Sequence, residues 1–206
     1  MITTDAELKA AIAACHAYLN PTSTPPQTGI RIAMLGDSHI AVPDWTQLLG
    51  RTDVSNHGIS GDTAANILAN PSRLQAVYDD APEVCFYMVG KNDIDAGISA
   101  GGIATSVRDI GVRLLDHRIE PIFLIPFYVS LTYQGAGYIN SMVNGIHSLS
   151  YQKCQDAGIT WLNDLDQLCV DNALQPQYTS DGCHLNASGQ AIWAQCIKNA
   201  IAALGV

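Results

Sequence analysis

The sequence has little positive charge, no long apolar run and no basic leader. Ten Lys and Arg residues stand against 19 Asp and Glu residues, which gives a net charge of −9. That field opposes a phosphate backbone, so we expect no nucleic-acid partner. No apolar stretch approaches the roughly 18 residues of a membrane span. The first residues carry no basic segment leading into an apolar one, so we expect no secretory signal, which slightly favours the cytoplasm.

The cysteines are scattered without close pairs, although the chain has six of them. Such spacing is typical of neither a zinc site nor a small disulfide scaffold. We expect most of them to be reduced and buried, because a free cysteine behaves as a small hydrophobe. Cys183 is the exception, since it lies between Asp181 and His184 and is open to pairing or to reaction with oxidants.

Apolar runs alternate with stretches of helical periodicity, which is typical of βαβ units around a parallel sheet. The expected strands are residues 30–35, 53–57, 83–89, 120–127 and 159–163. The expected helices are residues 43–49, 63–78 with a break at Pro71, 103–117, 138–157 and 187–204. Pro43 suits a first helical position, where a missing N–H costs nothing. Right-handed crossovers then predict a three-layer α/β/α sandwich.

The chain shows no internal repeat, low-complexity segment or long linker. Its 206 residues suit one ordinary globular domain with a substantial core, so we expect a single domain over residues 1–206. Within it we expect a helix over residues 5–19 and a proline-containing loop, so that residues 1–29 pack onto the sheet.

Several polar residues follow the expected strands, at the edge where open parallel sheets bind ligands. Ser38 comes directly after the first strand, whereas Asp181 and His184 lie on a loop near the other end of the chain. A serine hydroxyl needs a base to take its proton, and a histidine base is steadied by a carboxylate on its other nitrogen. Gly61 and Asn92 supply N–H groups for the oxyanion that attack on an ester creates. Taken singly, Ser38, the Asp181–His184 loop and Asn92 are better explained by a cap or a turn, whereas Gly61 fits a turn and an oxyanion donor equally well.

Four short blocks, taken in order, change that reading. They are Gly36-Asp37-Ser38, residues 56–63 (Asn-His-Gly-Ile-Ser-Gly-Asp-Thr), Gly90-Lys91-Asn92-Asp93 and Asp181-Gly182-Cys183-His184. This series resembles the SGNH, or GDSL-type, esterase and lipase family, from the first strand to the last helix.

The resemblance implies a role for each residue of the blocks. Ser38 would be the nucleophile, His184 the base and Asp181 its orienting acid. The backbone N–H groups of Ser38 and Gly61 and the side-chain amide of Asn92 would form the oxyanion hole. Gly61 is preferred over Gly58 because the family's donor glycine usually precedes the Asp-Thr pair. The resemblance also implies a flavodoxin-like five-stranded parallel sheet in the order 2-1-3-4-5, and no cofactor.

One residue departs from the family pattern, and two motifs compete with it. His39 stands where the family often has leucine, and we interpret it as a wall or a substrate contact rather than a rival base. Residues 97–101 match the G-x-S-x-G nucleophile elbow, but loop residues separate Ser99 from the strand, so a helix cap is the better interpretation. Asp93 and Asp95 lack the partners of a metal site.

The sequence therefore predicts a serine esterase that works through an acyl-enzyme intermediate. The compact chain has no obvious lid insertion, so short acyl groups, acetyl first, are favoured over lipid chains. The substrate would be a small-molecule ester or a carbohydrate ester; tyrosines within residues 127–138 either contact a sugar or pack their own loop. Two alternatives stay open: an acyltransferase with the same residues, and a catalytically silent carbohydrate-binding or interaction module.

Overall fold

A parallel sheet forms the centre of the protein in the computed structural model, which describes residues 29–163 and 165–206. Its strand order is β2-β1-β3-β4-β5, as the resemblance implied. The strands are β1 (Ile32–Gly36), β2 (Val54–Gly58), β3 (Val84–Met88), β4 (Glu120–Leu124) and β5 (Thr160–Leu162). Every residue of β1, β3 and β4 is buried, because helices cover both faces of the sheet.

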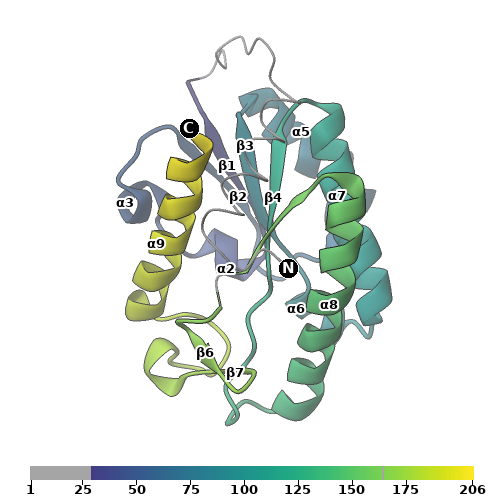
Figure 1. Ribbon diagram of the computed structural model, residues 1–206, viewed down its shortest axis with the longest axis vertical. Coiled ribbons are helices and arrows are strands. Elements are labelled where there is room, and N and C mark those ends of the chain that lie inside the picture. The colour runs from purple at the N-terminus through teal and green to yellow at the C-terminus, as the bar shows by residue number, and fades with distance from the viewer. Residues whose placement is uncertain (1–28, 164) are drawn as a thin grey trace.

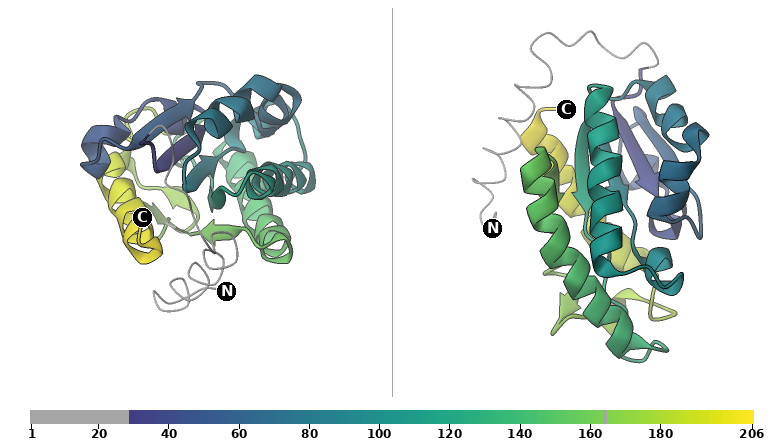
Figure 2. Two further views of the ribbon diagram at one scale, coloured as in Figure 1. Left: turned by 90° about the horizontal axis from the view of Figure 1, so that it is seen from above. Right: turned by 90° about the vertical axis from the view of Figure 1, so that its right-hand side faces the viewer.

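The helices form the two outer layers of the sandwich. They are α2 (Ser38–Ala41), α3 (Trp45–Leu49), α4 (Ala64–Ala69), α5 (Pro71–Asp80), α6 (Lys91–Asp95), α7 (Ala100–Asp116), α8 (Ala136–Ala157) and α9 (Ala187–Leu204). Helices α3 and α9 pack together on one side of the sheet, and α5, α7 and α8 lie on the other (Figure 1). The view from above in Figure 2 separates these layers. The expected α/β/α sandwich is therefore confirmed.

Most of the expected elements are present, with two local differences. Helix α3 begins at Trp45 behind an Asp44 cap, so Pro43 precedes the helix instead of opening it. Strand β4 ends at Leu124, because its neighbour β5 ends at the facing Leu162 and leaves the chain beyond without a partner strand. The break at Pro71 is confirmed, since it separates α4 from α5.

Short elements near the sheet's carboxyl edge went unrecognised in the sequence. They are α2, α6, the hairpin β6 (Cys169–Val170) and β7 (Ala173–Leu174), and the 3-10 helix η1 (Pro176–Tyr178). Each is too short to show a period. Ser99 caps α7 by accepting the N–H of Gly102, as expected. The helix expected over residues 5–19 lies outside the described residues. No helix in the described part of the chain has the length and apolarity to cross a membrane.

Candidate active site

Ser38 opens the first helical turn after the central strand β1. The residue before it, Asp37, caps this turn by accepting the N–H of His39 at 2.9 Å. Asp37 is almost completely buried, and burial raises the pKa of its carboxyl to about 7 despite that hydrogen bond and the nearby His184. Among the residues that the structure describes, this buried carboxyl forms no ion pair, and it directly precedes the serine in the chain.

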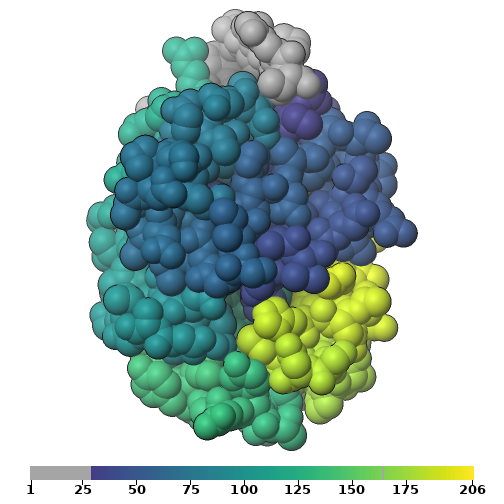
Figure 3. Space-filling view, turned by 180° about the vertical axis from the view of Figure 1, so that it is seen from behind, coloured from purple at the N-terminus to yellow at the C-terminus, as the bar shows by residue number. Residues whose placement is uncertain are grey.

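Ser38, His184 and Asp181 come together at the carboxyl edge of the sheet. Ser38 Oγ lies 2.9 Å from His184 Nε2, although 146 residues separate them in the chain. The other ring nitrogen, His184 Nδ1, lies 2.7 Å from Asp181 Oδ2. In Figure 3 the purple surface of the early part of the chain borders the yellow surface of its end. The two residue groups that the sequence singled out are thus in hydrogen-bond contact.

The loop holds Asp181 in place largely by itself. Asp181 Oδ1 accepts the N–H groups of Cys183 and His184, both at 2.8 Å. Gly182 connects this turn to the rest of the edge, since its carbonyl accepts the N–H of Ser130 at 2.7 Å. Burial raises the pKa of Asp181, but its hydrogen bonds with His184 and the two N–H groups outweigh burial and hold the pKa well below its usual range. Asp181 is therefore charged at neutral pH.

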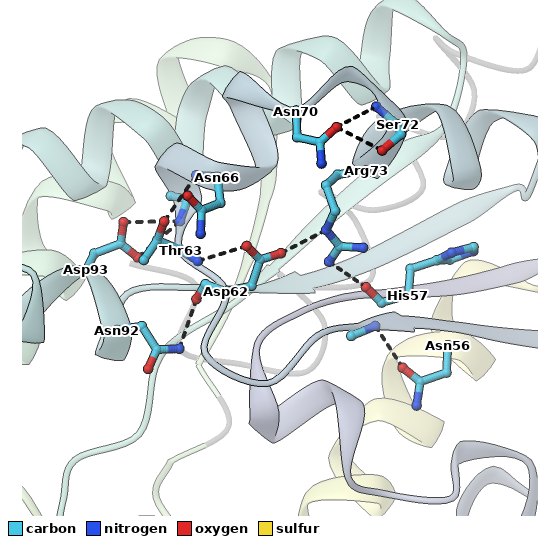
Figure 4. A network of polar contacts seen from close by, with 12 residues as sticks. Asn56, His57, Asp62, Thr63, Asn66, Asn70, Ser72, Arg73, Asn92 and Asp93 are labelled. Atoms are coloured by element: carbon cyan, nitrogen blue, oxygen red, sulfur yellow. Dashed lines mark hydrogen bonds and ion pairs between the residues drawn. The ribbon is translucent and has the colours of Figure 1, made fainter.

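Asn92 lies in α6, beside the loop that carries Gly61. Its amide Nδ2 donates to the carbonyl of Asp62 at 2.9 Å (Figure 4). A primary amide has two N–H donors, so a second remains for a ligand. Gly61 is exposed in a left-handed turn with φ of +82°, and no acceptor for its N–H occurs among residues 29–163 and 165–206. The glycine at position 58 has a packing reason instead. A Cβ there would lie 2.3 Å from the backbone nitrogen of Ala41 in α2, so only glycine fits.

A buried ion pair, which sequence reasoning missed, stabilises the same loop. Arg73 Nε donates to Asp62 Oδ2 and Arg73 Nη2 to the carbonyl of His57, both at 2.8 Å (Figure 4). Asp93 accepts the N–H of Ala64 at the start of α4, at 3.1 Å. Breaking such a buried pair typically costs about 3–5 kcal/mol. The one sequence signal was Arg73 itself. It lies on the buried face of α5, where the other buried residues, Leu74 and Val77, are apolar.

The possible metal pair of Asp93 and Asp95 is not assembled. Asp93 caps α4, whereas Asp95 pairs with Lys91 Nζ at 2.6 Å along its own helix. The two carboxylates therefore serve separate partners.

His39 and Cys183 both lie close to His184. The buried His39 ring lies 5.3 Å from the ring of Phe127 and 5.1 Å from that of His184, measured between centroids. Burial, with a further effect of His184, lowers the pKa of His39 to about 3, so its imidazole is neutral at physiological pH.

Cys183 is a free buried thiol, and burial raises the pKa of this thiol to about 11. Cys85 and Cys154 are free and buried as well, as expected.

A small apolar recess opens beside the serine hydroxyl, with a volume of about 20 Å³. It is lined by Ser38, His39, Val42, Pro43, His184, Leu185, Gln190 and Trp193. About 10–15 Å³ of such volume holds one water molecule. The recess thus has room for roughly one group of the size of a methyl, and His39 forms part of its wall.

A second serine, histidine and aspartate meet elsewhere, on the edge strand β2. His57 Nε2 lies 3.0 Å from Ser55 Oγ and 2.7 Å from Asp80 Oδ2. Both contacts use the same ring nitrogen. A histidine that accepts a serine proton needs its carboxylate on the opposite nitrogen, so this cluster has the residue types of a triad without its geometry.

Comparisons with known proteins assign the chain to a family. No curated protein sequence matches the chain. Among solved structures, a GDSL-like lipase from Bacteroides thetaiotaomicron is 22% identical with a TM-score of 0.69, covering 93% of this chain and 98% of that one. An acetylxylan esterase from Geobacillus stearothermophilus, solved as a catalytic mutant, is 15% identical with a TM-score of 0.68, covering 88% of this chain and 97% of that one. The model of the GDSL-like lipase/acylhydrolase family matches residues 32–192, and the protein belongs to that family of hydrolases.

Proposed function

We propose that this hydrolase is a serine esterase in which Ser38 attacks the acyl carbon of a carboxylic ester. The observation that carries the proposal is the position of the His184 ring, with Ser38 Oγ at 2.9 Å from one nitrogen and Asp181 Oδ2 at 2.7 Å from the other. With Nδ1–H donated to the charged Asp181, the lone pair of Nε2 is free to accept the serine proton.

The reaction then proceeds in two halves. Ser38 Oγ bonds to the acyl carbon while its proton passes to His184 Nε2, and Asp181 stabilises the imidazolium that forms. The tetrahedral intermediate collapses, and the departing alcohol takes the proton from His184. In the second half, His184 takes a proton from water, which attacks the acyl-serine, releases the carboxylic acid and restores the Ser38 hydroxyl.

The oxyanion of each intermediate needs N–H donors. We assign this role to the backbone N–H groups of Ser38 and Gly61 and to the Asn92 amide. Two observations support the assignment: the Gly61 N–H faces no acceptor in the described part of the chain, and Asn92 uses one of its two amide donors on Asp62. Each such donor is typically worth about 10²–10³ in rate.

We further propose that the acyl group is short, acetyl first. The recess beside Ser38 is about 20 Å³, which matches the size of an acetyl methyl. The Geobacillus stearothermophilus neighbour is described as an acetylxylan esterase, which is consistent with an acetyl ester of a carbohydrate as the substrate. At 15% identity, that likeness concerns the fold.

The test is a series of p-nitrophenyl esters of increasing acyl length, with acetylated xylo-oligosaccharides in parallel. We expect kcat/KM to be highest for acetyl and to fall by about tenfold or more for long acyl chains, because pocket fit changes rates by roughly 10–200-fold per methylene. Mass spectrometry after rapid quenching should find the acyl group on Ser38. Equal rates at all lengths would contradict the short-acyl proposal.

The same assay separates the two alternatives. An acyltransferase would convert most of the acyl donor to a new ester when a sugar alcohol is added, whereas an esterase releases the free acid. A silent binding module would neither turn over any ester nor react with a fluorophosphonate at Ser38.

A further inference from the structure

His39, Cys183 and His184 converge beside the serine from two distant segments of the chain. One nitrogen of each histidine and the Cys183 sulfur all lie within 4.8 Å of one another. His39 and Cys183 are buried, while the His184 side chain is 47% exposed and opens the cluster to solvent. None of the proposed steps uses His39 or Cys183.

These donor types are those of a borderline transition metal. Zn²⁺ binds imidazole nitrogen and thiolate sulfur in tetrahedral geometry, with bonds of about 2.0–2.3 Å, which places ligand atoms about 3.4–3.8 Å apart. The observed limit of 4.8 Å is about 1 Å wider, so metal binding requires the three side chains to move closer by about that distance. A water molecule or Ser38 Oγ completes the fourth position.

Two features make the histidines suitable as metal ligands. Zinc-binding histidines almost always donate their second ring N–H to a carboxylate, and His184 Nδ1 lies 2.7 Å from Asp181 Oδ2. That leaves His184 Nε2 as the coordinating atom. His39 is 7% exposed, and among residues 29–163 and 165–206 its ring nitrogens have no hydrogen-bond partner. A metal would provide one.

We propose that His39, Cys183 and His184 form an inhibitory site for Zn²⁺ or a similar divalent transition metal. As the sulfur–metal bond forms, the Cys183 thiol releases its proton to solvent, because a coordinating thiol is deprotonated. Nε2 of His184 has a single lone pair, so coordination removes it from Ser38 Oγ. The inhibition rests on the proposed esterase function, whereas metal binding itself does not.

Binding is tested with Co²⁺ on the full-length Ser38→Ala protein, kept reduced with a phosphine. We expect one Co²⁺ per chain to give the intense near-ultraviolet absorption of a thiolate–cobalt bond. Adding Cys183→Ala should abolish that band, whereas the control Cys196→Ala should keep it. A titration without the band, or a band that survives in Cys183→Ala, would overturn the proposal. Should Cys183→Ala fail to fold, judged by circular dichroism, Cys183→Ser replaces it.

Inhibition is tested on the otherwise unaltered enzyme with buffered free Zn²⁺. We expect a loss of acetyl-ester hydrolysis that a chelator reverses, and an inhibition constant at least tenfold weaker in Cys183→Ala and in His39→Leu. Equal inhibition of all three proteins would reject the site. If the metal-free enzyme hydrolyses no ester while the cobalt band forms, the esterase proposal fails and the metal site stands.

Discussion

The two serine–histidine–aspartate clusters of this protein contain the same side chains and differ in which ring nitrogen each partner contacts. In the first cluster, Ser38 and Asp181 contact opposite nitrogens of His184. In the second, Ser55 and Asp80 both contact Nε2 of His57. When His57 Nε2 carries a proton and donates it to the Asp80 carboxylate, that nitrogen has no lone pair left to accept the serine proton. Residue type alone therefore does not distinguish a reactive triad from a structural network.

The clusters also differ in how the chain assembles them. Ser55 and His57 are two residues apart on one strand, so their side chains share a face of β2 by local geometry alone. Ser38 and His184 come from opposite ends of the fold and meet only because β1 and the loop before α9 reach the same sheet edge. Ligand sites in such sheets occur at this carboxyl edge. The second cluster is instead built on β2 itself and on Asp80, the last residue of α5.

The largest expected difference between the clusters is the loss of the hydroxyl. Ser38→Ala should lower kcat/KM for p-nitrophenyl acetate by about 10⁴-fold or more, because a triad loses nearly all of its rate with its nucleophile. Ser55→Ala should keep kcat/KM within about threefold of the parent, since neither Ser55 nor His57 lines the recess beside Ser38. If both variants were equally active, the first cluster would not be the catalytic one.

The next expected difference is in the carboxylates. Asp181→Asn keeps an oxygen for the N–H groups of Cys183 and His184 but presents an amide to Nδ1, which favours the wrong histidine tautomer. We expect kcat to fall by roughly 10²–10⁴-fold. Asp80→Asn is the matched control, with kcat near the parent's. Steady-state kinetics at pH 8 measure both, and an unchanged kcat in Asp181→Asn would contradict the orienting role.

A smaller effect concerns Asp37, the buried residue that precedes Ser38 and has no counterpart in the second cluster. The pKa of Asp37 is raised to about 7 in the folded protein, above its ordinary value of 3.8. The folded state therefore holds this proton more tightly than the unfolded state. The stability that it contributes is fully present below about pH 4 and is lost as the pH rises through about 7.

Asp37→Asn tests this dependence, because asparagine can still accept the N–H of His39. Between pH 4 and pH 8 the free energy of unfolding of the parent should fall relative to that of the variant by a few kcal/mol. Denaturant melts at several pH values measure the difference. Parallel curves for the two proteins would show that Asp37 does not titrate in this range.

The smallest expected effect tests the structural role of the second cluster. Asp80→Ala removes the partner of His57 at the end of α5 and should lower the free energy of unfolding by roughly 0.5–1.5 kcal/mol, the typical net worth of one such interaction. An unchanged free energy of unfolding in Asp80→Ala would contradict a structural role for this contact.

Much of the fold was predictable because its signals are local. The alternation of apolar runs and helical periods indicated the sandwich, and the final helix was expected over its observed bounds, Ala187–Leu204. Pro71 marked a helix boundary for a steric reason that acts within one turn. Helix α2 and α6 were missed, since four or five residues show no period.

The candidate site divides in the same way. The order of four short blocks indicated the family and named Ser38, Asp181 and His184, because a turn after a strand and an Asp-x-x-His loop are encoded by neighbouring residues. The ion pair of Arg73 with Asp62 was not foreseen, because its partners lie on two elements whose packing no local pattern specifies.

By itself, the sequence determined the class of fold, the family and the residues proposed to react, since periodicity and short motifs depend on adjacent residues. Only the tertiary structure decided which nitrogen of each histidine meets which partner, how small the recess beside Ser38 is, and that His39 and Cys183 flank one imidazole. These are distances between segments far apart in the chain. They follow from the packing of the sheet and its helices, which places residues together whatever their separation in sequence.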